Sequence, residues 1–421
     1  MVESKRRVGV RIDEIRITPL ASREQVKILV LLHAPSAPWR IEVEALDGDH
    51  VVAHTEEETN AATANLTLNI TDAKLWSPSS PHLYTLRMRL YEGEELLDEI
   101  ESYAGLRDVE LRKGRVWLNG KPIYLAMVLD QGYWPESYLA APSDEALRLD
   151  VEMTKKFGFN GSRKHQKIED PRWLYWCDRL GLLVWGEMPN ARQWSSQAEE
   201  RLAAEWKRAI MRDYNQPCII AWVPVNESMG FPRLGREHPG QYAFIERMVA
   251  MTRQIDQRRP VIDNDGWEHT DITDICAIHD YTPTAGLLRK RYQDTLTGGA
   301  LPSHVWIGNK PLFVLGSRYR GQPIMLTEVG GFLMIPPDTP PDERDMLYRF
   351  YISINTHEEL LRKYRDLMEG IASLKFLAGF CYTQLTDIEQ ELNGLLIYDR
   401  TPKVPPEKIA EINRELFDVN T

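Results

Sequence analysis

The sequence predicts a multi-domain β plus α/β protein: an immunoglobulin-like β-sandwich over residues 1–113, then a (β/α)₈ TIM barrel over residues 114–421. Short segments that alternate apolar and polar residues fill the first part, whereas apolar strands and amphipathic helices alternate in the second. The 421 residues are enough for both parts at about 100–200 residues per domain. An apolar fraction of 43% excludes disordered and fibrous proteins.

Five segments of the first part have the two-residue period of half-buried strands. They are residues 8–12, 26–30, 41–45, 66–70 and 84–90. Turn-forming residues separate them, for example Asp47-Gly48-Asp49 and Glu92-Gly93-Glu94. Several short strands within about 105 residues indicate an antiparallel sandwich that carries no catalytic cluster.

Eight buried strand candidates follow, which is the number that a TIM barrel requires. They are residues 123–130, 160–166, 182–188, 218–227, 261–267, 275–281, 324–329 and 378–387. Helix signals stand between them: Ser143-Asp144-Glu145 begins one helix, and Asp170-Pro171 begins another that ends at Gly181. A last helix near residues 405–417 would close the barrel.

Charge and cysteine content exclude several classes of partner and predict a compartment. With 51 Lys and Arg against 62 Asp and Glu, the net charge of −11 argues against nucleic acid. No apolar run approaches the ~20 residues of a membrane span, and the charged start at residues 1–7 is unlike a signal peptide. The four cysteines lie far apart in apolar runs, which predicts buried free thiols in a reducing cytoplasm.

Two glutamates close otherwise apolar strands. Residues 219–225 lead to Asn226 and Glu227, and residues 324–327 lead to Glu328. Desolvation disfavours a charge at such a position unless the charge has a partner or a functional role. For either glutamate alone, a structural ion pair is the alternative to a functional role. At about 38 residues per βα unit, their separation of 101 positions puts them nearly three strands apart. They would face each other across the mouth, as the carboxyl pair of a glycoside hydrolase does.

Other polar residues at strand ends are candidates for substrate contacts. Arg163 and His165 lie on the second barrel strand, and Glu187 ends the third as a pocket group or a partner behind it. Asp130 and Trp134 follow the first strand and could form a binding wall. No second His or Cys lies at ligand spacing from His165, so we expect no metal site.

Several motifs together resemble glycoside hydrolase family 2. In the barrel they are Leu118-Asn119-Gly120-Lys121-Pro122, Gly158-Phe159-Asn160-Gly161-Ser162-Arg163-Lys164-His165, Trp222-Val223-Pro224-Val225-Asn226-Glu227-Ser228 and Pro323-Ile324-Met325-Leu326-Thr327-Glu328. Leu75-Trp76-Ser77-Pro78 and Pro81-His82-Leu83-Tyr84 resemble the signature of the family's immunoglobulin-like domain. The resemblance runs from about residue 10 to about residue 403, with the motifs in the family's order.

The resemblance implies a retaining mechanism without a cofactor, since the family contains β-galactosidases, β-glucuronidases and β-mannosidases of this kind. By motif, Glu227 would be the acid/base and Glu328 the nucleophile. Asn226 would bind the hydroxyl beside the anomeric carbon, and Tyr281 would hydrogen-bond the nucleophile. The expected partner is a carbohydrate substrate.

The chain also departs from the family pattern. It starts directly with the sandwich, without the usual jelly-roll domain, and Ala126-Met127 replaces an Arg-Gly pair whose arginine lies near the nucleophile. We therefore expect Glu328 to lack a cationic neighbour and to have a raised pKa. Smaller side chains replace expected aromatic residues at Val225, Met229 and Val329. These departures predict a remodelled pocket rim, natural or engineered.

The sequence thus predicts a retaining exo-β-glycosidase whose two carboxyl groups lie about 5–5.5 Å apart. One alternative is the same fold with a weak or redirected site, and another is a carbohydrate-binding scaffold. The sugar and the existence of a homo-oligomer stay open.

Overall fold

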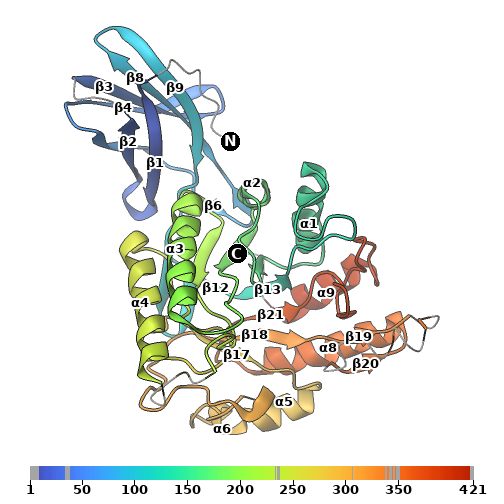
Figure 1. Cartoon of the computed structure of the whole chain (residues 1–421). Coiled ribbons are helices and arrows are strands. Elements are labelled where there is room, and N and C mark those ends of the chain that lie inside the picture. Colours follow the sequence, from blue (N-terminus) through green and yellow to red (C-terminus); the bar gives the residue numbers. More distant parts are fainter. Residues whose placement is uncertain are drawn as a thin grey trace. The chain divides into compact units, whose positions relative to one another are not determined.

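The computed structural model describes residues 9–33, 38–232, 234, 238–305, 307–336, 339–340, 344, 347 and 351–417 (Figure 1). It divides into two compact units. The first comprises residues 1–109, 118–120 and 212–217, and the second comprises residues 110–117, 121–211 and 218–421. The domain boundary near residue 113 stays a prediction.

The first unit is the predicted immunoglobulin-like sandwich of two antiparallel sheets. One sheet has the order β1-β2-β5 and the other β4-β3-β8-β9. The strands are β1 (Arg11–Leu20), β2 (Gln25–His33), β3 (Trp39–Asp47), β4 (His50–Thr59), β5 (Thr63–Asn69), β8 (Tyr84–Glu92) and β9 (Glu95–Ala104). Short elements accompany them: η1 (Ala21–Arg23), β6 (Trp76–Ser77) and β7 (Ser80–Pro81). Alternate side chains such as Val26, Ile28 and Val43 form the core, which explains the two-residue period.

The sequence pattern did not mark β4 and β9. All side chains of β4 are exposed or half-buried, so it has no apolar face to detect. In β9 one of the buried positions is Asp98, which accepts a hydrogen bond from the backbone N–H of Ile12 at 2.9 Å. The first predicted strand began at Val8, which lies outside the described residues, and β1 begins at Arg11.

The second unit is built on a curled parallel sheet with the order β16-β15-β14-β13-β21-β18-β17. Its strands are β13 (Leu125–Asp130), β14 (Gly161–Lys164), β15 (Leu183–Glu187), β16 (Ile219–Val223), β17 (Cys276–His279), β18 (Ile324–Gly330) and β21 (Leu377–Thr383). Each overlaps one of the predicted barrel strands. The remaining small sheets consist of β10 (Val109–Arg112), β11 (Arg115–Leu118) and β12 (Lys121–Ile123), and of β19 (Leu333–Met334) and β20 (Ser353–Ile354).

The fifth predicted strand, residues 261–267, is irregular but occupies the remaining place in the barrel. Parallel bridges join Val261 to Trp222 and Asp265 to Asn226, beside the end of β16. On its other side the N–H of His279 donates to the carbonyl of Gly266 at 3.4 Å. The segment therefore closes the (β/α)₈ barrel between β16 and β17.

Helices follow the strands, and those predicted at Ser143, at Asp170-Pro171 and near residues 405–417 are present. They are α1 (Asp144–Lys156), α2 (Pro171–Leu180), α3 (Ser196–Asp213), α4 (Pro239–Ile255), α5 (Ala285–Arg291), α6 (Gln293–Leu296), α8 (His357–Ser373) and α9 (Pro406–Leu416), with the short η2 (Ile307–Asn309). Ser143 Oγ accepts from the N–H of Ala146 at 3.2 Å and caps α1. Gly181 ends α2 with a φ of 75°, which favours glycine.

An apolar cluster packs the sheet against the helices. Ala126 and Val128 of β13 and Phe380 of β21 belong to it, together with Leu367 of α8 and Ile409 of α9. Side chains alternate along a strand, so the other set, which includes Met127 and Leu129, points toward the barrel interior. No helix in the described ranges is both long and apolar enough to cross a membrane. All four cysteines are buried free thiols, as predicted.

Candidate active site

A pocket of about 280 Å³ lies at the carboxyl ends of the barrel strands. The described residues that line it are Leu129, Gln131, His165, Gln166, Glu227, Met229, Tyr281, Glu328, Tyr351, Thr383 and Glu391. TIM barrels place their ligand sites at this end of the sheet. The two glutamates singled out in the sequence therefore share one pocket.

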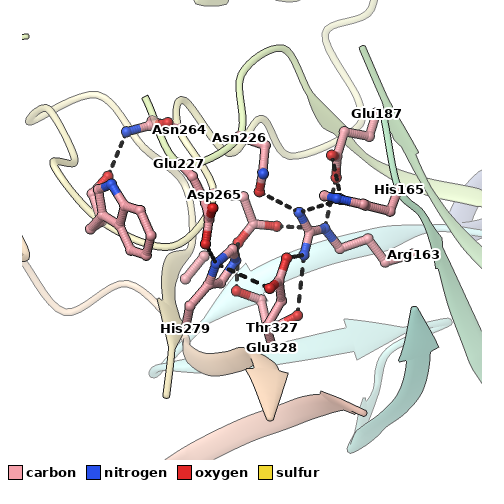
Figure 2. Close-up of polar contacts among 12 residues, drawn as sticks. Arg163, His165, Glu187, Asn226, Glu227, Asn264, Asp265, His279, Thr327 and Glu328 are labelled. Atoms are coloured by element: carbon pink, nitrogen blue, oxygen red, sulfur yellow. Dashed lines mark hydrogen bonds and ion pairs between the residues drawn. The ribbon is translucent and has the colours of Figure 1, made fainter. Parts of the chain in front are cut away.

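The guanidinium of Arg163 is the centre of a buried polar network beside the pocket (Figure 2). Its Nε lies 2.7 Å from Glu187 Oε2 and 2.9 Å from Asp265 Oδ2. Nη1 lies 2.9 Å from Glu328 Oε1, and Nη2 donates to Asn226 Oδ1 at 2.6 Å. Burial opposes the charge, but the carboxylates of Asp265, Glu187 and Glu328 outweigh it and raise the pKa of Arg163 well above its ordinary value. The network thus contains a permanent cation.

Glu328, in β18, is held as a carboxylate. Tyr281 Oη donates to its Oε2 at 2.6 Å, while Arg163 contacts its Oε1. Burial favours the neutral form, but the charges of His279, Arg163 and His165 and the Tyr281 hydrogen bond oppose burial, and the net result is a lowered pKa of Glu328. The group is therefore ionised at neutral pH, as a nucleophile must be.

Glu227 follows β16 in a left-handed turn that directs its side chain into the pocket. Glu227 and Ser228 have φ values of 54° and 52°, which are unfavourable for residues other than glycine. Two hydrogen bonds hold the turn. The N–H of Glu227 donates to the carbonyl of Asp265 at 2.8 Å, and the N–H of Ser228 donates to Asn264 Oδ1 at 2.9 Å.

His279 joins the two glutamates. Its Nδ1 lies 2.7 Å from Glu227 Oε1 and 3.5 Å from Glu328 Oε2. One carboxylate oxygen of each glutamate and one ring nitrogen all lie within 4.8 Å of one another, a spacing that could also suit a metal ion. Burial opposes protonation of the ring, but Glu328, Asp265 and Glu227 raise the pKa of His279 to about 10. The protonated ring pairs with both carboxylates in an ion-paired cluster.

Glu187 lies behind the pocket rather than in its wall. It is fully buried, and its Oε1 lies 2.9 Å from His165 Nδ1 and accepts from the N–H of Gln166 at 3.1 Å. Burial lowers the pKa of His165, but Glu187 more than offsets this and the pKa is raised. Glu187 therefore orients both Arg163 and His165, which is the second of the two roles considered from the sequence.

Asp130 and Trp134 are not among the described residues that line the pocket. Asp130 Oδ2 lies 2.6 Å from Lys164 Nζ in a buried ion pair. Trp134 is covered by the guanidinium of Arg400, 3.5 Å from the ring centre. The structure thus gives both residues partners within the barrel wall, and it brings neither to the sugar wall proposed from the sequence.

The expectation that Glu328 lacks a cationic neighbour is wrong. Arg163 of β14 provides the cation, and the pKa of Glu328 is lowered rather than raised. Ala126 belongs to the apolar cluster between sheet and helices, and neither Ala126 nor Met127 is among the described pocket residues. The neighbouring strand can supply a cation that the first barrel strand lacks. The motif of the first strand, taken alone, could not reveal that cation.

Of the three positions expected to alter the pocket rim, one lines the pocket and two do not. Met229 lines the pocket and is 42% exposed. Val225 is buried, and Val329 belongs to the apolar cluster. Among these positions, only the change at Met229 reaches the pocket.

Asp265, His279 and Glu391 were not identified from the sequence. His279 stands two positions before Tyr281, and that spacing on a strand puts both side chains on one face, a signal that could have found it. The polar run Asp263-Asn264-Asp265 inside a predicted buried strand was a second signal. Glu391 lies beyond the last strand in a loop, where no periodicity points to the pocket.

Known proteins resemble both units. The family described as glycosyl hydrolases family 2 matches residues 10–107, and its TIM barrel domain matches residues 109–412. A β-galactosidase of Pectobacterium atrosepticum is 31% identical over 272 residues, which are 60% of this chain and 25% of that protein. A β-galactosidase of Vibrio cholerae is 33% identical over 223 residues, or 49% of this chain and 20% of that protein. The chain spans about a quarter of the length of these curated relatives.

Solved structures share the fold at low identity. A Bifidobacterium dentium β-glucuronidase complexed with coumarin-3-O-glucuronide has a TM-score of 0.77 and 21% identity, covering 98% of this chain and 68% of that one. A β-galacturonidase of Eisenbergiella tayi bound to galacturonate has a TM-score of 0.73 and 19% identity, covering 97% and 73%. Because the TIM barrel domain of the family matches well over half of the residues, the chain belongs to glycoside hydrolase family 2.

Proposed function

We propose that the protein is a retaining exo-β-glycosidase in which Glu328 is the nucleophile and Glu227 the acid/base. The observation that carries the proposal is the pair of glutamates in one pocket, with carboxylate oxygens within 4.8 Å of each other. Retaining enzymes need such proximity, because their nucleophile attacks the sugar directly, whereas inverting enzymes leave room for water with carboxyls about 6.5–9.5 Å apart.

In the first step, Glu328 attacks the anomeric carbon while Glu227 donates its proton to the glycosidic oxygen. The ion pair with Arg163 and the hydrogen bond from Tyr281 support this role, since both favour the ionised form of Glu328. Glu227 Oε1 accepts from His279, so Oε2 is the oxygen available to carry the proton. The leaving group departs as an alcohol, and Glu328 becomes a glycosyl ester.

In the second step, Glu227 takes a proton from water, which attacks the anomeric carbon and releases the sugar with retained configuration. Glu227 regains its proton and Glu328 its negative charge. No metal or organic cofactor enters either step of this proposal.

Asn226 is the proposed contact for the hydroxyl beside the anomeric carbon. Its Oδ1 accepts from Arg163, which fixes the amide so that Nδ2 is the donating end. Nδ2 is buried and finds no hydrogen-bond partner among the residues that the structure describes. A buried donor without a partner is unfavourable, and a sugar hydroxyl would satisfy it.

The pocket supports exo action on a terminal sugar. Its volume of about 280 Å³ lies just below the ~300–1,000 Å³ range of small-molecule sites. Relatives named β-galactosidase, and solved structures named β-glucuronidase and β-galacturonidase, act on different sugars, so the family does not select one.

The roles can be tested with aryl β-glycosides and azide. Glu328→Ala should abolish turnover, and azide should not restore a β-configured product. Glu227→Ala should still be glycosylated by substrates with good leaving groups, which need little protonation. Azide should then accelerate its second step and yield a β-glycosyl azide, identified by NMR.

Glu169→Gln is the matched control, because Glu169 is a buried carboxylate of the barrel paired with Lys164 at 2.7 Å outside the described pocket lining. It should retain turnover. Equal losses in both catalytic variants, neither rescued by azide, would contradict the assigned roles. Suppose that the wild-type protein hydrolyses no glycoside and that the Glu328→Gln variant binds sugar as well as the wild type does. The protein would then be a binding protein instead.

A further inference from the structure

We propose that His279 is a positioning residue that serves as the shared counter-cation of the two glutamates, compensating Glu328 before the sugar is attached and Glu227 afterwards. This inference rests on the proposed function. It assigns to one buried ring a task in both halves of the reaction, although the ring itself does not touch the sugar.

The geometry places the ring between the two carboxylates (Figure 2). Nδ1 lies 2.7 Å from Glu227 Oε1 and 3.5 Å from Glu328 Oε2, and Nε2 lies 3.3 Å from Asp265 Oδ1. The ring is completely buried and packs edge-on against Trp267, with 5.5 Å between ring centres. It therefore occupies a fixed position within reach of either glutamate.

The backbone makes room for this ring at Gly266. Its φ of 108° is accessible to glycine, and a Cβ atom there would lie 2.7 Å from His279 Nδ1. Asp265, the preceding residue, is itself held by the Thr327 hydroxyl and by Arg163. Asp265, which faces Nε2 of the ring, is thus fixed by contacts of its own.

The carboxylates around the ring favour its protonated form. Burial disfavours the charge, but Glu328, Asp265 and Glu227 raise the pKa of His279 to about 10. These three carboxylates are the charged groups that face it from β18, from the 261–267 segment and from the turn after β16. The cation of Arg163 lies beyond them, bound to Asp265 and Glu328.

The reaction moves one negative charge across this cluster. Before the first step Glu328 is a carboxylate and Glu227 is protonated, whereas in the glycosyl-enzyme Glu328 is a neutral ester and Glu227 is a carboxylate. His279 neither gains nor loses a proton in this exchange. Because its N–H is close to both oxygens, the charge has a partner at each stage without rearrangement of the buried network.

The test is His279→Asn, which keeps a donor near the Nδ1 position and removes the charge. An opposite charge within ~4–6 Å lowers a carboxylate pKa by ~1–3 units. Without it, the acidic limb of the pH profile of kcat/KM, which depends on ionised Glu328, should move to higher pH by about 1–3 units, and activity on the acidic side should fall about 10- to 1,000-fold.

His269→Asn is the matched control. His269 is also fully buried and its Nδ1 lies 2.8 Å from a carboxylate, Asp263, but its other ring nitrogen contacts the backbone of Ala277. This variant should lose stability without moving either limb. If His279→Asn loses activity but its pH profile stays unshifted, like the profile expected of the control, the ring is only structural. That result would overturn the inference.

A measurement on the wild-type protein covers the case in which His279→Asn does not fold. With ¹⁵N-labelled histidine, the ring nitrogens of His279 should show an imidazolium from about pH 5 to about pH 9. A neutral ring at pH 7 would overturn the inference. A wild-type protein without glycosidase activity would instead defeat the proposed function, and an active wild type with an unshifted His279→Asn profile would defeat the inference alone.

Discussion

Arg163 shows how one side chain organises the site. A fully buried guanidinium is strongly disfavoured by desolvation unless carboxylates surround it, and here Glu187, Asp265 and Glu328 all lie within 2.9 Å. Removing Arg163 would leave these three carboxylates without the cation that they share. The residues that position the proposed nucleophile are therefore also residues that keep the barrel interior stable.

Tyr281 can be tested separately from this ionic network. Tyr281→Phe removes the 2.6 Å hydrogen bond to Glu328 Oε2, so the pKa of Glu328 should rise. Because activity requires ionised Glu328, the acidic limb of kcat/KM should move to higher pH. A lost hydrogen bond to a charged group, at about 1.5–3 kcal/mol, predicts a loss of roughly 10- to 100-fold in rate at acidic pH.

Tyr292→Phe is the control for Tyr281. Tyr292 is also buried, and its hydroxyl donates to Asp280 Oδ2 at 2.9 Å outside the described pocket lining. Its pH profile should equal that of the wild type. An identical shift in both variants would show that the effect comes from packing rather than from Glu328.

At the scale of elements, side chains at helix ends fix how each helix meets the next strand. After α4, Asp256 accepts from Trp222 Nε1 at 2.8 Å and lies 2.7 Å from Arg259 Nη1. The N–H of Arg258 also donates to it at 3.0 Å. One carboxylate thus ties the turn after α4 to β16.

Asp256→Asn should destabilise the protein in a pH-dependent way. Burial raises the pKa of Asp256, but Arg259 and the hydrogen bonds reduce it from 3.8 to about 2. At 1.36 kcal/mol per unit this shift corresponds to about 2 kcal/mol. Since the folded pKa is the lower one, the contribution is complete above about pH 4 and disappears as the pH falls toward 2.

The measurement is urea unfolding of the wild type and of Asp256→Asn at neutral pH and near pH 3. The difference in free energy of unfolding should be near 2 kcal/mol at neutral pH and clearly smaller at the acidic pH. A difference independent of pH would assign the loss to packing instead of charge.

At the scale of the whole molecule, the chain carries an excess of negative charge. The chain has a net charge of −11, and three carboxyl groups, Glu227, Glu328 and Glu391, line the described pocket. Burial raises the pKa of Glu391, and the nearby charge of Glu328 adds to that rise. The net charge would repel an anionic sugar on approach, whereas it would not repel a neutral sugar.

Aryl β-galactosides should therefore be cleaved faster than aryl β-glucuronides, by at least about tenfold at 10 mM salt. Raising the salt to about 0.3 M shortens the range of the repulsion, so the uronide rate should increase while the galactoside rate stays nearly constant. The measurement is kcat/KM for both substrates at the two salt concentrations. A uronide that is the better substrate at low salt would contradict this prediction.

Sequence patterns alone predicted the architecture, because apolar periodicity reports burial directly. β14, β15 and β18 each overlap a predicted strand, and α1 and α2 begin at their predicted caps. Apolar periodicity failed where the burial of side chains does not follow an apolar pattern. β4 has no buried face, and the 261–267 segment carries polar side chains into the barrel interior.

The sequence by itself determined the family, the barrel order and the two glutamates, since each depends on a contiguous motif or a periodic stretch of chain. Only the tertiary structure decided which charges surround them. Arg163, Asp265 and His279 come from three different parts of the barrel wall, and Ala126 turns away although its motif pointed to the pocket. Electrostatic neighbours are set by distances across the barrel, and those distances exist only after strands far apart in the sequence have closed around one interior.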